Sequence, residues 1–184
     1  GVVALDPVEL AALGANLELR AGHSLLEETD HVGRTSFLLA VQTRDVHKAR
    51  LVLELGSDPA HRSCSSETAA VLAARGNDST MLSWLQSIGA ELDHEDRTRE
   101  TPLAGAVDFD AVDAARFLLE HGANPHGHNS SGDPLIQSVT DPEIARMLVV
   151  AGADWADTGP EVQRLLVGLA NDVPVVTDMR SYRS

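Results

Sequence analysis

The chain is poor in several residue types, and each shortage excludes a class of protein. Aromatic side chains make up only 3 % of its 184 residues, so a core must be built mainly from Leu, Val and Ala, which suit closely stacked helices. Cys64 is the single cysteine, which excludes an internal disulfide and fits a reducing compartment. No apolar run approaches the roughly 18 residues that a membrane-spanning helix needs. Since no secretory leader is visible either, we expect a cytoplasmic protein.

Basic residues are also scarce. The chain has 28 acidic and 14 basic residues, a formal charge of −14. This balance argues against nucleic acid as a partner and against an anionic membrane surface, because both are bound mainly through Lys and Arg. It favours a basic protein as the partner, although an acidic surface that only keeps the protein soluble is an equally open interpretation. Lys48 is the single lysine beside 13 arginines, a bias typical of a GC-rich bacterial genome.

The sequence contains no convincing catalytic or metal-binding constellation. His61 and His94 lie 33 residues apart and so occupy equivalent places in successive units, about 8–10 Å from each other, which is too far for one zinc ion. His126 and His128 are expected to be exposed loop residues. Nucleophile, phosphate-binding and metalloprotease motifs are absent. We therefore predict a protein that is not an enzyme and has no cofactor, no metal and no small-molecule substrate.

Two series of residues recur along the chain in phase. Gly56, Gly89, Gly122 and Gly152 lie 33, 33 and 30 residues apart, and each follows an apolar segment. Thr35, Thr68 and Thr101 are again 33 residues apart. A fixed period of this length indicates a stack of small supersecondary units, each of which buries its apolar face against its neighbours.

The unit between Thr101 and Gly122 shows most clearly which residues begin and end the two helices of a repeat. Thr101 can cap a helix with its hydroxyl, and Pro102 suits the first helical position. Leu103 begins an apolar stripe at helical spacing. A second helix follows, and Gly122 ends it with the left-handed conformation that other residues adopt only at a cost. The same plan predicts helix-turn-helix units along the whole chain.

The motif Thr101-Pro102-Leu103, with Gly122-Ala123-Asn124 after the second helix, resembles the ankyrin repeat. Weaker copies begin at Thr35, Thr68 and Pro134. This resemblance covers about residues 29–157 and implies an all-α solenoid of stacked helix-turn-helix units with projecting loops. No unit has the family's histidine in its first helix; Leu38, Val71, Ala104 and Ile136 stand there instead.

The resemblance also gives the expected organisation of the chain. Residues 1–170 form one domain, with a degenerate first unit over 1–28 that includes an insertion. Full repeats cover 30–62, 63–95, 96–128 and 129–158, a capping helix covers 159–170, and 171–184 is a tail. We expect the fourth repeat to be shortened at its inter-helix turn, at Thr140-Asp141-Pro142.

Resemblance to ankyrin proteins implies that a partner binds the concave face formed by the first helices and the loops. Phe109 is either an exposed anchor for the partner or a core residue covering the short fourth repeat, and Trp155 is either an anchor or packed on the capping helix. The candidate partner-binding residues are His31, Arg34, Gln42, Thr43, Glu67, Arg75, Arg97, Glu100, Asp108, Phe109, Asp110, Ser130 and Trp155.

The leading functional hypothesis is a protein-protein interaction module that binds a basic protein. One form of it is a bacterial immunity protein or antitoxin that occludes a toxin enzyme such as a nuclease. The alternative is a structural or regulatory scaffold subunit, for which a homodimer is one arrangement.

Overall fold

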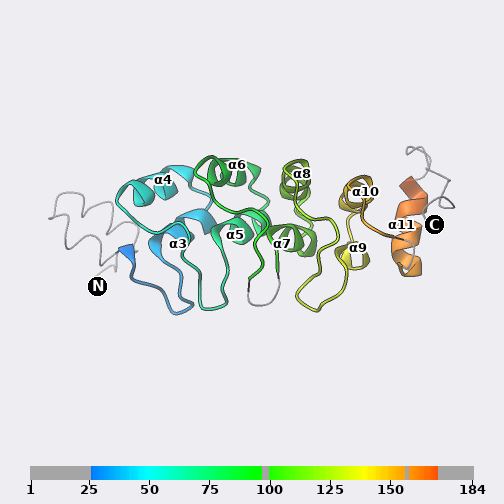
Figure 1. The fold of residues 1–184 in the computed structure, drawn as a ribbon, viewed down its shortest axis with the longest axis horizontal. Helices are drawn as coiled ribbons and strands as arrows, with labels where there is room; N and C mark the ends of the chain where they lie inside the picture. The colour runs from blue at the N-terminus through cyan, green and yellow to red at the C-terminus, as the bar shows by residue number, and fades with distance from the viewer. Residues whose placement is uncertain (1–25, 97–99, 156–157, 170–184) are drawn as a thin grey trace, which may run out of the picture.

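The structure, a computed structural model, describes residues 26–96, 100–155 and 158–169, and it consists of helix pairs stacked along one axis (Figure 1). In the described residues the only pairing of extended backbone is an isolated bridge between His128 and Pro134. The all-α solenoid of stacked helix-turn-helix units expected from the sequence is therefore confirmed.

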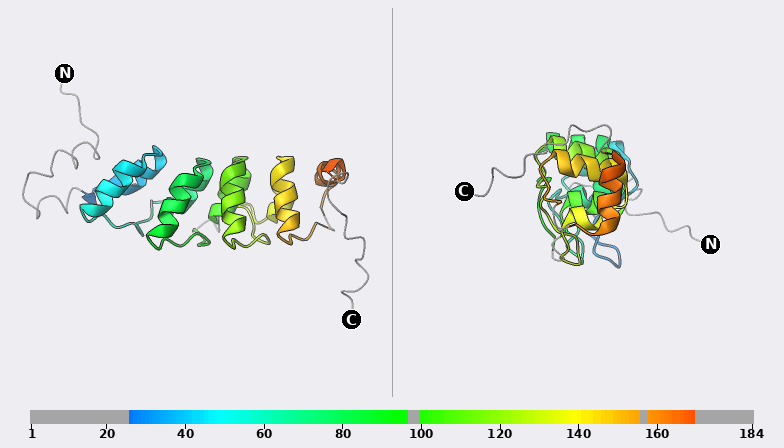
Figure 2. Two further views of the ribbon diagram at one scale, coloured as in Figure 1. Left: turned by 90° about the horizontal axis from the view of Figure 1, so that it is seen from above. Right: turned by 90° about the vertical axis from the view of Figure 1, so that its right-hand side faces the viewer.

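The helices form two rows (Figure 1). The first row, from which the loops project, contains α3 (Ser36–Gln42), α5 (Ala69–Arg75), α7 (Pro102–Asp108) and α9 (Leu135–Ser138). The second row contains α4 (Val46–Glu54), α6 (Ser79–Ser87), α8 (Val112–Glu120) and α10 (Pro142–Val150), which lie side by side when seen from above (Figure 2). The helix α11 (Pro160–Leu169) follows α10 at the C-terminal end, where the capping helix was predicted.

Side-chain caps fix where most of these helices begin. The Thr101 hydroxyl accepts a hydrogen bond from the backbone N–H of Ala104 at 3.1 Å, and Pro102 is the first residue of α7. Asp45, Asp78 and Asp141 cap the second helices α4, α6 and α10 in the same way. These caps satisfy N–H groups that have no partner within the helix.

The glycine series ends the second helices as expected. The φ angles are 101° at Gly56, 84° at Gly89, 88° at Gly122 and 102° at Gly152, all in the left-handed region. A residue with a Cβ reaches this region only with strain, so the series is a conformational requirement of the fold.

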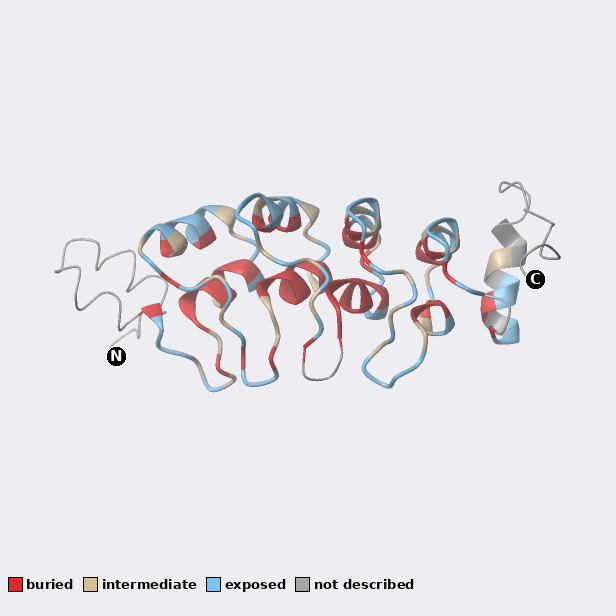
Figure 3. Cartoon of the chain, in the orientation of Figure 1, coloured by how far each residue is buried: buried red, intermediate tan, exposed pale blue. Residues whose placement is uncertain are grey.

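The core lies between the two rows (Figure 3). The first helices are almost completely buried, whereas the second helices bury one side and expose the other. Leu38, Val71 and Ala104, which replace the family's histidine, are all fully buried, so apolar packing fills this position.

The fourth repeat is short for a reason other than the one predicted. Its inter-helix turn, 139–141, has the same length as the turn 109–111 of the third repeat. The loops 88–101 and 121–134 before α7 and α9 are also equal in length. The deficit lies in α9 itself, which has 4 residues where α7 has 7. Since the loops match, α9 lacks the C-terminal turn that α7 possesses.

Several predictions fall outside the described residues. They are the degenerate first unit up to residue 25, most of its insertion, and the tail 171–184. The described part of the chain begins at Leu26, which is buried in the core.

Candidate functional site

The candidate site begins with two sets of equivalent positions on the face predicted to bind a partner. Just before the threonines that precede the first helices stand Arg34, Glu67 and Glu100, spaced by 33 residues. At the ends of the first helices stand Gln42, Arg75 and Asp108, again spaced by 33. In each of the first two repeats, the two positions face each other. The Arg34 guanidinium donates to Gln42 Oε1 at 2.7 Å, and the Arg75 guanidinium donates to Glu67 Oε1 at 2.5 Å.

Arg75 also bridges two repeats. Its Nε and a terminal nitrogen donate to the two carboxylate oxygens of Glu100, at 2.9 and 2.5 Å. This is the two-pronged geometry that makes arginine-carboxylate pairs strong and directional. One guanidinium therefore connects the loop before α5 with the loop before α7, and it holds the face of the second repeat in register with the third.

The pair between Arg75 and Glu100 is largely withdrawn from water. Glu100 is only 3 % exposed, and its backbone N–H donates to an Asp96 carboxylate oxygen at 2.9 Å. Burial opposes the charge of Arg75, but Glu100 and Glu67 outweigh it and raise the pKa of the guanidinium. The sequence predicted Glu100 as a partner-contact residue, whereas the structure buries it and both of its carboxylate oxygens accept hydrogen bonds from Arg75.

Gly105 makes room for this pair, and the sequence analysis did not single it out. A Cβ at this position of α7 would lie 3.0 Å from Glu100 Oε1 and 3.1 Å from Arg75 Cγ. A glycine inside a helix lowers helix stability by about 1 kcal/mol relative to alanine. A glycine inside the predicted helix was therefore the signal in the sequence that another group approaches the helix backbone there.

The third repeat differs from the first two, each of which has an arginine at one of these positions. Its two positions, Glu100 and Asp108, are both acidic, so the repeat supplies no cation of its own at this place. Burial raises the pKa of Asp108, and the positive charge of Arg75 offsets only part of that effect. The carboxylates of Glu67, Glu100 and Asp108 act on the Arg75 guanidinium, and Asp110 follows two residues after Asp108, so these five residues together carry a formal charge of −3.

Phe109 lies beside these charges and faces solvent. Its side chain is 61 % exposed, so the interpretation that it turns inward to cover the fourth repeat is wrong. The Arg75 guanidinium carbon lies 5.5 Å from the centre of the ring, within the range of a cation-π interaction. We call Glu67, Arg75, Glu100, Asp108, Phe109 and Asp110 together the Arg75 surface.

The other candidate residues do not join this surface. His31 and Ser130 are exposed loop residues, and the Thr43 hydroxyl donates to the Ala40 carbonyl at the end of α3. Trp155 is 39 % exposed, near the other end of the stack. Arg97 lies outside the described residues.

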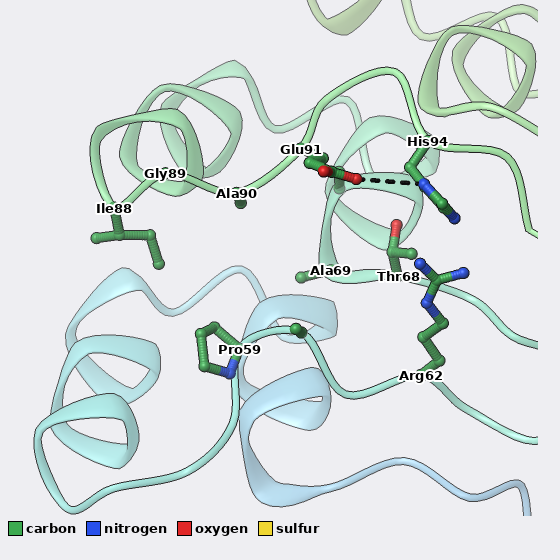
Figure 4. A pocket seen from close by; sticks show the side chains of 11 residues that line it. Pro59, Arg62, Thr68, Ala69, Ile88, Gly89, Ala90, Glu91 and His94 are labelled. Carbon is green, nitrogen blue, oxygen red and sulfur yellow. Dashed lines mark ion pairs between the residues drawn. The ribbon is translucent and has the colours of Figure 1, made fainter.

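A groove elsewhere on the stack offers no comparable chemistry. It has a volume of about 340 Å³, and Pro59, Ala69 and Ile88 line it, with Arg62 and His94 at one end (Figure 4). A second groove, of about 270 Å³, is lined by Pro125 and Ile136. These two residues stand 66 positions after Pro59 and Ala70, which also lines the first groove. Such gaps therefore recur between repeats as a property of the stacking.

Two other features are absent from the residues that the structure describes. There, His, Cys, Asp and Glu form no group of three or more able to hold a metal ion. No helix in that part of the chain has the length and apolar character needed to cross a membrane.

Comparisons with known proteins agree with the helical repeat fold. A family model described as ankyrin repeats (3 copies) matches residues 37–129 and 70–158. Among solved structures, the chain resembles an ankyrin repeat domain from Acinetobacter baumannii with a TM-score of 0.62 and 23 % identity, over 74 % of this chain and 76 % of the other. The comparison with curated proteins finds no match. The chain belongs to the ankyrin repeat family, whose members are generally non-catalytic modules for protein-protein interaction.

Proposed function

We propose that this chain is a cytoplasmic binding module that takes a basic protein on its concave face, with the Arg75 surface at the centre of the contact. The observation that carries the proposal is the unmatched charge of that surface, where the carboxylates of Glu67, Glu100 and Asp108 act on the single guanidinium of Arg75, and Asp110 adds a fourth acid next to Phe109. Complementary charge accelerates encounter and disfavours acidic competitors.

Two features suit this surface to binding. Arg75 is fixed by three hydrogen bonds to Glu67 and Glu100, so the surface is preorganised and loses little side-chain entropy when a partner arrives. Phe109 exposes most of an aromatic ring at its centre, and aromatic side chains often dominate the affinity of an interface. A toxin-neutralising immunity protein or antitoxin is one form of this function, and charge complementarity with a basic enzyme is the support for it.

A capture experiment with paired charge reversals tests the proposal. Wild-type protein, Asp108→Lys and Glu120→Lys are immobilised, and each is exposed to an extract of the source cells at low and at high salt. Glu120 is an exposed acid at the end of α8, so its reversal changes the net charge equally without touching the Arg75 surface. We expect basic proteins that bind wild-type protein and Glu120→Lys but are lost with Asp108→Lys and at high salt.

The opposite result is equally specific. If the proteins that distinguish the two variants are acidic, or if both reversals act alike, the concave face does not bind a basic protein. Light scattering over a range of concentrations separates this function from the homodimeric scaffold, which predicts a dimer that Asp108→Lys dissociates.

A further inference from the structure

We propose that Phe109 is an arginine-docking site, on which an arginine of the partner stacks against the ring while pairing with the carboxylates of Asp108 and Asp110. This inference rests on the proposed function and names the side chain that the partner contributes. It commits to arginine because a planar guanidinium can stack on a ring and grip a carboxylate at the same time, whereas an ammonium is a strongly hydrated point charge.

The stack already contains one example of this arrangement. Arg75 lies 5.5 Å from the centre of the Phe109 ring and uses its N–H groups on Glu67 and Glu100. The ring therefore accepts a guanidinium that is held at the same time by neighbouring carboxylates. With 61 % of Phe109 exposed, most of the ring remains open to a second one.

The short fourth repeat explains why this place is open. The first helix α7 ends at Asp108, directly before Phe109, while α9 lacks the corresponding last turn. The residue of the fourth repeat that would stand where Gln42, Arg75 and Asp108 stand is therefore missing. A partner arginine would give the third repeat a guanidinium paired with carboxylates, as Arg75 does for the second repeat.

The charges favour a second guanidinium there. Arg75 is engaged by two carboxylates, so its own positive charge is compensated and repels a newcomer little. Asp110 accepts a hydrogen bond from the Thr140 hydroxyl at 2.6 Å, which holds its carboxylate beside the short repeat and leaves further acceptor sites on it. Asp108 is exposed, so a partner cation can reach its carboxylate. The surrounding protein still shields that carboxylate in part from water, which raises its pKa, and a cation beside it favours the ionised form.

Three matched peptides test the inference. The isotope-labelled full chain is titrated at low salt with a capped Gly/Ser peptide that carries three arginines, with its lysine counterpart and with its citrulline counterpart, which keeps the planar group without the charge. We expect amide shifts centred on residues 108–111 and an affinity for the arginine peptide roughly two- to fivefold above that for the lysine peptide, the size of an exposed cation-π contact. The citrulline peptide should bind most weakly.

Variants of Phe109 then separate stacking from simple charge attraction. Phe109→Leu should lower the affinity for the arginine peptide by roughly two- to fivefold, while Phe109→Tyr should retain it. Ile88→Ala, which trims an exposed apolar side chain outside the Arg75 surface, should change nothing.

Each contrary outcome has its own meaning. If Phe109→Leu binds the arginine peptide as wild type does, or if arginine and lysine peptides bind equally, there is no arginine-docking site. Loss of both peptides in Asp108→Asn would then still agree with the proposed function. Absence of any shift overturns the docking site, while the capture experiment decides separately whether the face binds a basic protein.

Discussion

Asn77 offers the sharpest test of how neighbouring repeats support each other. The helix α8 begins after Ala111, which cannot cap it, although Asp45 and Asp78 occupy the same place in the two preceding repeats. The missing cap comes from the preceding repeat, because Asn77 Oδ1 accepts a hydrogen bond from the backbone N–H of Ala114 at 2.9 Å. Replacing Asn77 with alanine should therefore destabilise a helix that lies 37 residues further along the chain.

The expected loss can be divided into two terms. Removing a capping oxygen decreases stability by about 1 kcal/mol. Asn77 also has a φ of 52°, a left-handed conformation that asparagine tolerates and that alanine adopts at a further cost of about 1 kcal/mol. The sum is about 2 kcal/mol, which for a domain of this size lowers Tm by about 4–8 °C.

Thermal unfolding and hydrogen exchange measure the two consequences. Asn77→Ala should lower Tm and accelerate exchange of the Ala114 amide relative to amides of α6. Arg44→Ala is the matched control. Arg44 occupies the same turn position one repeat earlier, with a φ of 58°, but the second helix of the next repeat, α6, already has its own cap in Asp78. That variant should stay within about 0.5 kcal/mol of wild type.

A second substitution asks whether the cap itself is responsible. Ala111 is 2 % exposed, so a carboxylate there would be desolvated, and a small neutral cap is the better test. Ala111→Ser supplies a capping hydroxyl, so it should recover up to about 1 kcal/mol in the Asn77→Ala background and much less in wild type. The reasoning fails if Asn77→Ala is no worse than Arg44→Ala, or if Ala111→Ser gains as much in both backgrounds.

Three further predictions concern other contacts of the stack. Arg75→Met should lower the unfolding free energy by about 3 kcal/mol because it leaves the carboxylate of Glu100 buried without its main partner, whereas Glu67→Gln, at a more exposed carboxylate, should cost less than about 1 kcal/mol in denaturant titrations. Burial opposes the charge of Asp30, but the backbone N–H groups and guanidinium it accepts from lower its pKa. The ionised Asp30 carboxylate therefore stabilises the fold fully at pH values above its unfolded pKa of about 3.8, and this contribution is lost as pH falls through the folded pKa. The stabilities of wild type and Asp30→Asn should thus differ most near neutral pH and converge in acid. Phe109→Ala should weaken partner binding while stability changes by less than about 0.5 kcal/mol, since the ring is exposed.

Each of these three has an outcome that contradicts it. Equal losses for Arg75→Met and Glu67→Gln would mean that the burial of Glu100 carries no weight. A constant difference between wild type and Asp30→Asn from neutral pH into acid would show that ionisation of this carboxylate does not stabilise the fold. Unfolding of Phe109→Ala would place the ring in the core after all.

The sequence alone determined the architecture, because the residues that define it act locally. A glycine at φ near 90° and a threonine whose hydroxyl caps a neighbouring backbone N–H depend on a few adjacent residues, and they recur with the period of the fold. The same reasoning located most of the Arg75 surface, since equivalent positions of successive repeats must share one face.

Tertiary structure decided which of these residues act together, and how. Only stacking brings Glu100 to Arg75 across 25 residues, buries that carboxylate and places Asn77 at the start of α8. The three-residue deficit was visible as a glycine spacing, but its location in α9, and with it the exposure of Phe109, required the backbone. The physical reason is that a long polar side chain can reach several partners, and the choice among them depends on what the neighbouring repeats bring within hydrogen-bonding distance.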